Sequence, residues 1–141
     1  MCSLFVVLAV FAGFKLAAQS AKQTTSPEQI APHEAEILIY LLPQAQELRK
    51  HGMDVGWELQ TSLKLNQRDF YTYWVVNSKR PNVEGSVTVG YFSVNKHTAE
   101  VWDENNEKVV DAGELEGVER ILRRAHHIDE ETLHKFSSLR P

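Results

Sequence analysis

Six histidines and 19 acidic residues are the side chains of this 141-residue chain that could bind a metal ion or transfer protons. His126 and His127 are adjacent, so on a helix they point about 100° apart and cannot bind one ion together, and the HExxH spacing is absent. His126 and Glu130 are four residues apart, but Ile128-Asp129 between them predicts a helix break. We therefore predict no metal site and interpret the histidines as surface or helix-end residues.

Nucleophilic catalysis has little support in the sequence. The single cysteine is Cys2, no Gly-x-Ser-x-Gly motif occurs, and Ser86 and Ser93 have no recognisable base partner. Acidic pairs are expected in loops or first helical turns, where carboxylates stay solvated and stabilise the helix dipole. These pairs are Asp103-Glu104, Glu114-Glu116 and Glu130-Glu131. The sequence therefore predicts no catalytic residue and no cofactor.

Aromatic residues are the stronger indication of function. In a strand over residues 70–77, alternation places Tyr71 and Tyr73 on one face of the sheet and Trp74 on the other, and Tyr91 and Phe92 also point to opposite faces. Both faces are then partly aromatic, so either the C-terminal helices cover the second face or an aromatic surface stays open to a partner. The residues expected to form this binding surface are Tyr71, Tyr73, Tyr91 and Trp57.

An N-terminal helix is expected to pack on this sheet. From His33 to His51, apolar residues recur at helical spacing, which predicts one buried stripe. The residues of the stripe are Ile37, Leu38, Leu41, Leu42, Ala45 and Leu48. Pro43 removes a hydrogen bond, so the helix is kinked there or is two helices. Gly52 follows basic residues and is typical of a helix C-terminus.

Four strands are predicted after this helix, in the order of an antiparallel meander. They are Met53 to Thr61, Phe70 to Asn77, Ser86 to Asn95 and Ala99 to Asp103. Asp111 and Glu114 then resemble a capping box for a helix that presents Leu115, Val118, Ile121 and Leu122 on one face, and Asp129 begins a short terminal helix. The predicted fold class is α+β.

The last hairpin of the meander carries a short motif. Asn95 tolerates left-handed backbone and caps its own turn, and the Thr98 hydroxyl bonds locally, so both residues favour a tight reversal. The segment Val94 to Val101, together with the preceding helix and strands, resembles the PepSY type of small exported domain over residues 34–103. Asn95 and Ala99 stand where that pattern has Asp and Gly. The resemblance implies a non-catalytic module, often associated with peptidase inhibition or the cell envelope, and cystatin-like and nuclear-transport-factor-like folds are similar in outline.

The N-terminus predicts export. Residues 4–14 are apolar or small and are followed by small residues, a pattern typical of a secretory signal peptide. The run ends at Lys15, whereas a membrane-spanning helix needs about 20 apolar residues. An uncleaved tether and a core segment are the alternatives. We predict a signal peptide of residues 1–18, with cleavage as late as Ala21, a flexible leader of residues 19–30 and one domain of residues 31–141, secreted or periplasmic and without stable membrane insertion.

Charge narrows the class of partner. The formal net charge of the chain is −4, and loss of the signal peptide removes one base, Lys15, and no acid. This mild acidity argues against nucleic acid and against an anionic membrane surface. The length that remains suits one domain with one core.

Together these features predict an exported, non-enzymatic binding or inhibitor module whose partner is a protein or an envelope component such as a peptidase. The first alternative is a small enzyme or ligand-binding protein with a pocket between helix and curved sheet, lined by Trp57, Tyr73, Trp74 and Tyr91. The second is a structural domain that forms a homodimer through its sheet. A deep pocket with a buried ionisable group would favour the enzyme, whereas a flat, exposed aromatic face would favour the binder.

Overall fold

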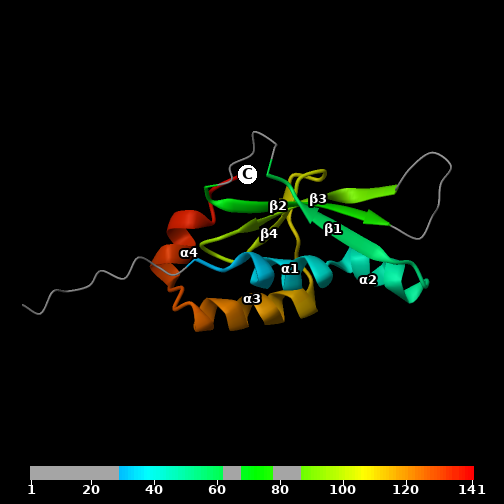
Figure 1. Cartoon of the computed structure of the whole chain (residues 1–141). Helices are drawn as coiled ribbons and strands as arrows, with labels where there is room; N and C mark the ends of the chain where they lie inside the picture. The colour runs from blue at the N-terminus through cyan, green and yellow to red at the C-terminus, as the bar shows by residue number, and fades with distance from the viewer. Residues whose placement is uncertain (1–28, 62–67, 78–86) are drawn as a thin grey trace, which may run out of the picture.

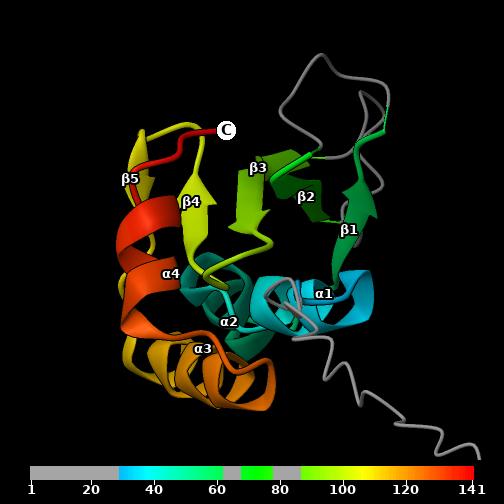
Figure 2. The ribbon, with the colours of Figure 1, turned by 90° about the vertical axis from the view of Figure 1, so that its left-hand side faces the viewer.

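The structure is a computed structural model that describes residues 29–61, 68–77 and 87–141. The predicted signal peptide, most of the predicted leader and Ser86 lie outside the described residues. Three helices lie beneath one face of a five-stranded antiparallel sheet, and a fourth lies beside the β4–β5 edge (Figures 1 and 2). The α+β meander predicted from the sequence is confirmed.

The first helical segment is divided at Pro43, as predicted. Helix α1 (Pro32–Tyr40) ends before the proline, and α2 (Pro43–Lys50) begins with it. Proline is tolerated at the first position of a helix, because an N–H group there makes no hydrogen bond within the helix. Gly52 has φ of 71°, in the left-handed region that favours glycine, and its N–H donates to the Arg49 carbonyl at 2.9 Å. The predicted stripe is right for Leu38, Leu42 and Ala45, but Ile37 is exposed, because the buried face of α1 is formed by Ala35, Leu38 and Ile39.

The sheet has the strand order β1-β2-β3-β4-β5. Its strands are β1 (Val55–Leu59), β2 (Phe70–Asn77), β3 (Val87–Asn95), β4 (Val101–Asp103) and β5 (Lys108–Val109). The β2 and β3 bounds agree closely with the sequence prediction, and β5 was not predicted. In the β3–β4 turn, Asn95 Oδ1 accepts the His97 and Thr98 N–H groups at 2.9 and 3.2 Å, and the residue with left-handed backbone is Ala99, with φ of 61°.

The alternation of β2 and β3 is also confirmed. Tyr73 pairs with Phe92, and these residues point toward α1, whereas Trp74 pairs with Tyr91 on the outer face. The inner face packs on α1 and α3 in one core that includes Leu38, Val75, Phe92, Val94 and Leu115. Ile30 also belongs to this core, because it is 1% exposed and its N–H donates to the Lys96 carbonyl at 3.0 Å. The packed domain therefore includes Ile30, which the sequence assigned to the leader.

The C-terminal helices are α3 (Gly113–Ala125) and α4 (Glu130–Phe136). The predicted capping box at Asp111 is wrong, because Ala112 is the N-cap and no side chain caps it. The predicted start of the last helix at Asp129 is confirmed, since its carboxylate accepts the Thr132 N–H at 2.8 Å. After α4 the chain returns to the outer face of the sheet, where the Arg140 guanidinium lies 4.4 Å from the centre of the Trp102 ring.

Candidate functional site

The candidate site begins with a carboxylate on the buried stripe of α3. Leu115 and Leu122 are buried, and Glu119 lies four residues after the first and three before the second, so all three share one helical face. Glu119 is 6% exposed. Ile121, which the sequence placed on this face, is 63% exposed, because it points away from the sheet.

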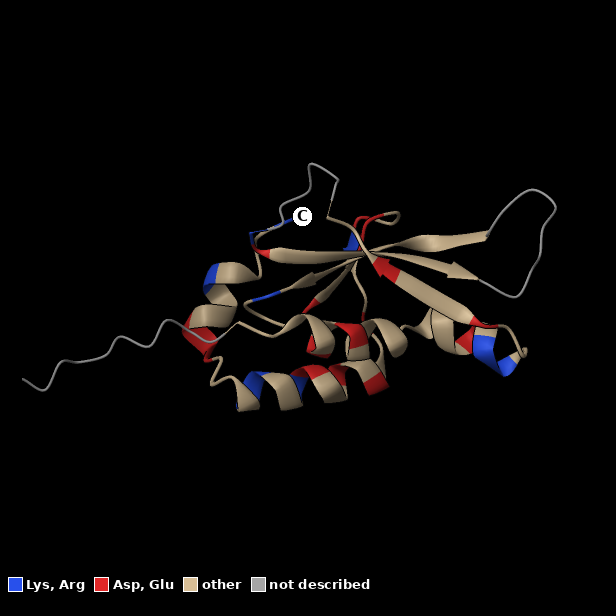
Figure 3. Cartoon of the chain, in the orientation of Figure 1, with Lys and Arg blue, Asp and Glu red and all other residues tan. Residues whose placement is uncertain are grey.

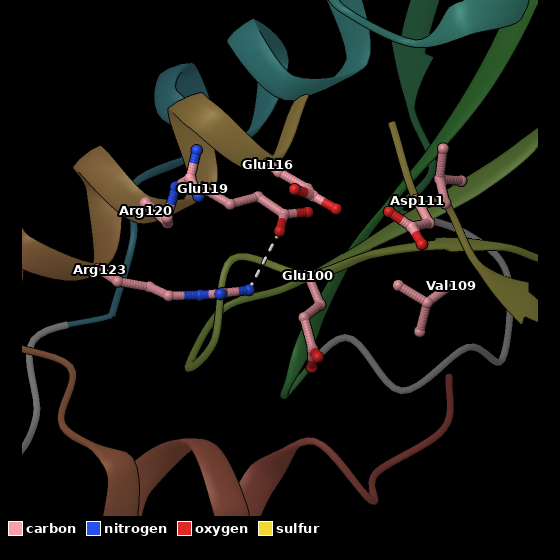
Figure 4. Close-up of a pocket in the computed structure, with 8 residues that line it drawn as sticks. Glu100, Val109, Asp111, Glu116, Glu119, Arg120 and Arg123 are labelled. Atoms are coloured by element: carbon pink, nitrogen blue, oxygen red, sulfur yellow. Dashed lines mark hydrogen bonds and ion pairs between the residues drawn. The ribbon is translucent and has the colours of Figure 1, made fainter. Parts of the chain in front are cut away.

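A cavity of about 440 Å³ lies beside this stripe, between α3 and the β4–β5 region. Its volume is in the range of pockets that bind small ligands. Charged side chains from three parts of the chain line it (Figure 4): Glu119 and Glu116 come from α3, Glu100 precedes β4, and Asp111 follows β5. The remaining lining residues are Val109, Val110, Arg120 and Arg123.

The two oxygens of the Glu119 carboxylate have different environments. Oε2 forms an ion pair with the Arg123 guanidinium at 3.1 Å, and Arg123 Nε also donates to the Thr98 carbonyl at 2.7 Å. Oε1 is buried and has no hydrogen-bond partner of normal geometry, although the Val101 N–H is near enough to lower the pKa of Glu119. Figure 4 shows the side chain extending from α3 into the space between Glu116 and Glu100.

Burial raises the pKa of Glu119 to about 7, against the effect of Arg123, and the nearby Glu100 and Glu116 carboxylates raise it further. The pKa of Glu116 is also raised, first by a hydrogen bond with Asp111 and then by the charge of that residue. The carboxyl groups around the cavity therefore raise the pKa values of Glu119 and Glu116, because like charges close together disfavour ionisation.

The cavity carries more negative than positive charge. Four carboxyl groups line it, together with the two guanidinium groups of Arg120 and Arg123. Figure 3 shows the acidic residues toward the beginning of α3 and the basic residues toward its end. Such a surface favours cations. Within residues 29–61, 68–77 and 87–141, no group of three or more His, Cys, Asp and Glu residues is arranged to hold a metal ion.

The aromatic residues expected to form one binding surface are not together. Tyr73 is fully buried and its hydroxyl donates to the Pro32 carbonyl at 3.1 Å, so its expected place on an exposed face is wrong. Tyr71, half-buried, also faces α1 and donates to the Ile30 carbonyl at 3.2 Å. Trp57 lies on the same side, edge-on to Tyr40 at 6.2 Å, whereas Tyr91 is 36% exposed on the outer face.

This division also excludes the pocket proposed for the enzyme alternative. Trp57 and Tyr73 lie on the helix-covered face, while Trp74 and Tyr91 pair on the opposite face, so one pocket cannot be lined by all four. Trp74 and Trp102 are half-buried and are not core residues. The acidic cavity, which was not among the sequence predictions, is a pocket with a buried ionisable group.

Two histidines are mostly buried and pair with carboxylates. His126 lies at the end of α3, in agreement with the helix-end interpretation, whereas His97 lies in the β3–β4 turn and is not a surface residue. His126 Nε2 lies 2.8 Å from Glu34 Oε2 and joins the end of α3 to α1. Burial raises the pKa of Glu34, but the Ala31 N–H and His126 outweigh it and hold this pKa below its usual value. His97 Nε2 lies 2.9 Å from Asp69 Oδ1, and its ring stacks on Phe136 at 4.0 Å.

The partly buried carboxyl group of Glu104 lies on the outer face of the sheet. Ser93 Oγ contacts Thr72 Oγ1 across the β2–β3 pair at 2.5 Å and Glu104 Oε1 at the same distance. Burial raises the pKa of Glu104. Ser93 is fully buried, so a substrate cannot reach its hydroxyl, and we assign this chain of bonds to sheet stability.

The sequence did contain one signal for the cavity. Glu119 interrupts the apolar stripe of α3 between Leu115 and Leu122, and a carboxylate on a buried stripe is uncommon. Glu100 and Asp111 had no such signal, because their positions depend on how the β4–β5 hairpin packs against α3.

The fold and the cavity define a small α+β domain with an acidic pocket at one side of its sheet. No family model matches the sequence, and no curated protein matches it significantly. Among solved structures, a chain in the structure of a type VI secretion system effector-immunity complex from Pseudomonas protegens has a similar fold, with a TM-score of 0.59. The identity is 19%, and the match covers 79% of this chain and 89% of that chain. At this identity the similarity establishes a shared fold only. No helix among the described residues is long and apolar enough to cross a membrane.

Proposed function

We propose that this protein is an exported binding module that binds and inhibits a protein partner, as one half of an effector-immunity pair. The observation that carries the proposal is the fold similarity, which spans 89% of a chain from such a complex. The proposed location is the periplasm or the outside of the cell. The resemblance of the hairpin to PepSY-type domains is part of the same proposal, since it also implies a non-catalytic inhibitory role.

The acidic cavity is the proposed contact site. Its charged walls come from α3, from the segment before β4 and from the segment after β5, so one partner residue that enters it contacts three parts of the fold. Charged groups at an interface raise association rates and select partners of opposite charge. The partner surface is therefore expected to be basic.

The test is inhibition by the purified protein. The secreted form is cross-linked in the cells that produce it, the captured protein is purified, and its activity or toxicity is measured with and without the module. Inhibition at a 1:1 ratio is expected, with at least tenfold weaker binding for Glu100→Arg and unchanged binding for the exposed α4 control Glu131→Arg. A captured protein whose activity is unaffected at stoichiometric amounts would contradict the proposal.

An enzymatic or ligand-binding role is the second candidate, because one observation favours it. A carboxyl group with a pKa of about 7 in a cavity suits a general acid or base. Turnover that depends on an ionisation near pH 7 and is lost in Glu119→Gln would support this role. The ion pair with Arg123 argues for the binding role instead, because it engages one of the two carboxylate oxygens.

A further inference from the structure

The unpartnered oxygen of Glu119 indicates what the acidic cavity binds. A buried carboxylate oxygen without a donor costs free energy, and almost all such atoms in folded proteins have a partner. Glu119 Oε1 is buried among the lining residues of the cavity, and the nearby Val101 N–H does not form a hydrogen bond of normal geometry with it. A donor supplied from outside would satisfy it.

The surrounding charges favour a cationic donor over a neutral one. Asp111 and Glu116 share a hydrogen bond, and the Thr98 hydroxyl donates to Glu100 Oε2 at 2.9 Å, which fixes that carboxylate at the cavity wall. Arg123 is engaged by both Glu119 and the Thr98 carbonyl, so it compensates one carboxylate. Arg120 can compensate a second, which leaves two of the four carboxyl groups in excess. An anion would meet this excess negative charge and is disfavoured.

A guanidinium group fits this arrangement better than an ammonium group or a metal ion. It is planar, presents five donors in a fork that matches carboxylates, and is weakly hydrated, which suits a partly buried site. Glu119 already accepts a guanidinium nitrogen of Arg123 at Oε2.

We propose that the cavity beside α3 receives the guanidinium group of an arginine side chain of the partner, which binds between Glu119, Glu100 and the Asp111–Glu116 pair. The arginine donates to Glu119 Oε1 from the side opposite Arg123. This inference rests on the proposed function only in that the arginine belongs to the protein partner. The binding site itself belongs to the isolated chain.

The test uses a probe and no partner. The blocked tripeptide Gly-Arg-Gly is titrated into the secreted protein by NMR, beside the same peptide with citrulline, which has the shape of arginine without its charge. Saturable shifts of the Thr98 and Glu119 amides are expected with the arginine peptide only. The double variant Glu100→Gln/Glu119→Gln should weaken binding at least tenfold, and Glu131→Gln should leave it unchanged.

The outcomes separate this inference from the proposed function. Equal binding of the citrulline peptide, an equal loss with Glu131→Gln, or binding of calcium in place of the peptide would overturn the arginine site, even where partner inhibition holds. Peptide binding without inhibition of any captured partner would overturn the proposed function and leave the site intact. If the double variant does not fold, the exposed pair Asp111→Asn/Glu116→Gln replaces it, with the same expected loss.

Discussion

Glu104 on the outer face of the sheet and Glu119 beside α3 both carry a carboxyl group that burial makes harder to ionise. Glu104 accepts a hydrogen bond from Ser93, which in turn contacts Thr72 on the neighbouring strand. Glu119 has Arg123 at one oxygen, and its other oxygen is buried without a partner of normal geometry.

The difference separates a structural carboxylate from one prepared for a ligand. A satisfied buried network stabilises and specifies a fold, whereas a partly satisfied one costs stability. The region of Glu104 lies within a packed sheet, while Glu119 adjoins a cavity of about 440 Å³. Variants that weaken the packed sheet should therefore lower stability, and variants of the cavity should change binding and pH dependence.

The largest expected effect comes from the core on which both regions depend. Tyr73→Ala removes a fully buried ring and its hydrogen bond to the Pro32 carbonyl, and should lower the free energy of unfolding by about 3 to 5 kcal/mol. Trp74→Ala is the matched control on the outer face, where the ring is half-buried, and should cost clearly less. Urea unfolding of both variants decides the order. The sequence analysis placed Tyr73 on an open binding surface, and a larger loss for Trp74→Ala would favour that placement.

The next effect tests the satisfied network. Ser93→Ala leaves the Glu104 carboxylate and the Thr72 hydroxyl without their shared partner, and should cost about 1.5 to 3 kcal/mol. The double variant Ser93→Ala/Glu104→Ala removes the stranded carboxylate as well and should recover part of the loss. Thermal and urea unfolding measure these two variants and the single variant Glu104→Ala, which completes the cycle. Strictly additive losses would show that the two residues are not coupled.

Glu119→Gln tests the cavity carboxylate through the pH dependence of the free energy of unfolding. A carboxyl group whose pKa rises on folding, from 4.5 to about 7, binds more protons when folded, so the free energy of unfolding falls as pH rises across this window. Gln cannot ionise. Relative to the natural chain, the free energy of unfolding of the variant should therefore rise by about 2.5 kcal/mol as the pH rises from 5 to 8, since one pKa unit corresponds to about 1.4 kcal/mol.

The control for this prediction is Glu131→Gln, an exposed α4 residue, which should show the same pH dependence as the natural chain. Urea unfolding at pH 5, 6, 7 and 8 gives the change of the free energy of unfolding with pH for each variant. A constant difference between Glu119→Gln and the natural chain would mean that the pKa of Glu119 does not change on folding.

The elements of the fold could be predicted because their signals are local. Pro43 and Gly52 act through their own backbone, the Asn95 side chain bonds to N–H groups two and three residues further on, and β2 and β3 follow from alternation. Strand β5 has two residues, too few for a pattern. Alternation also placed Tyr73 opposite Trp74, but it does not say which face the helices cover, because that depends on how α1 and α3 pack on the sheet.

The candidate site was missed for a related reason. Glu100, Asp111 and Glu119 belong to three different parts of the chain, and only packing brings them to one cavity. The acidic pairs in the sequence appeared solvated because neighbours along the chain say nothing of burial. Ser93 likewise obtains its carboxylate partner from the turn after β4, across the sheet.

The smallest expected effect concerns the turn that joins the packed sheet to the cavity. Ala99 lies between Thr98, whose carbonyl accepts from Arg123, and Glu100 at the cavity wall, and its φ is 61°. A non-glycine residue with left-handed backbone costs roughly 1 kcal/mol, so Ala99→Gly should remove this strain. The same change loses a buried methyl group and makes the unfolded chain more flexible, and both effects lower stability. We expect the net change in the free energy of unfolding to lie within about 0.5 kcal/mol of zero. Ala45→Gly, buried inside α2 without such strain, is the matched comparison and should cost about 1 kcal/mol or more. Urea unfolding of the two variants compares them directly, and equal losses would show that the turn holds Glu100 at the cavity without backbone strain.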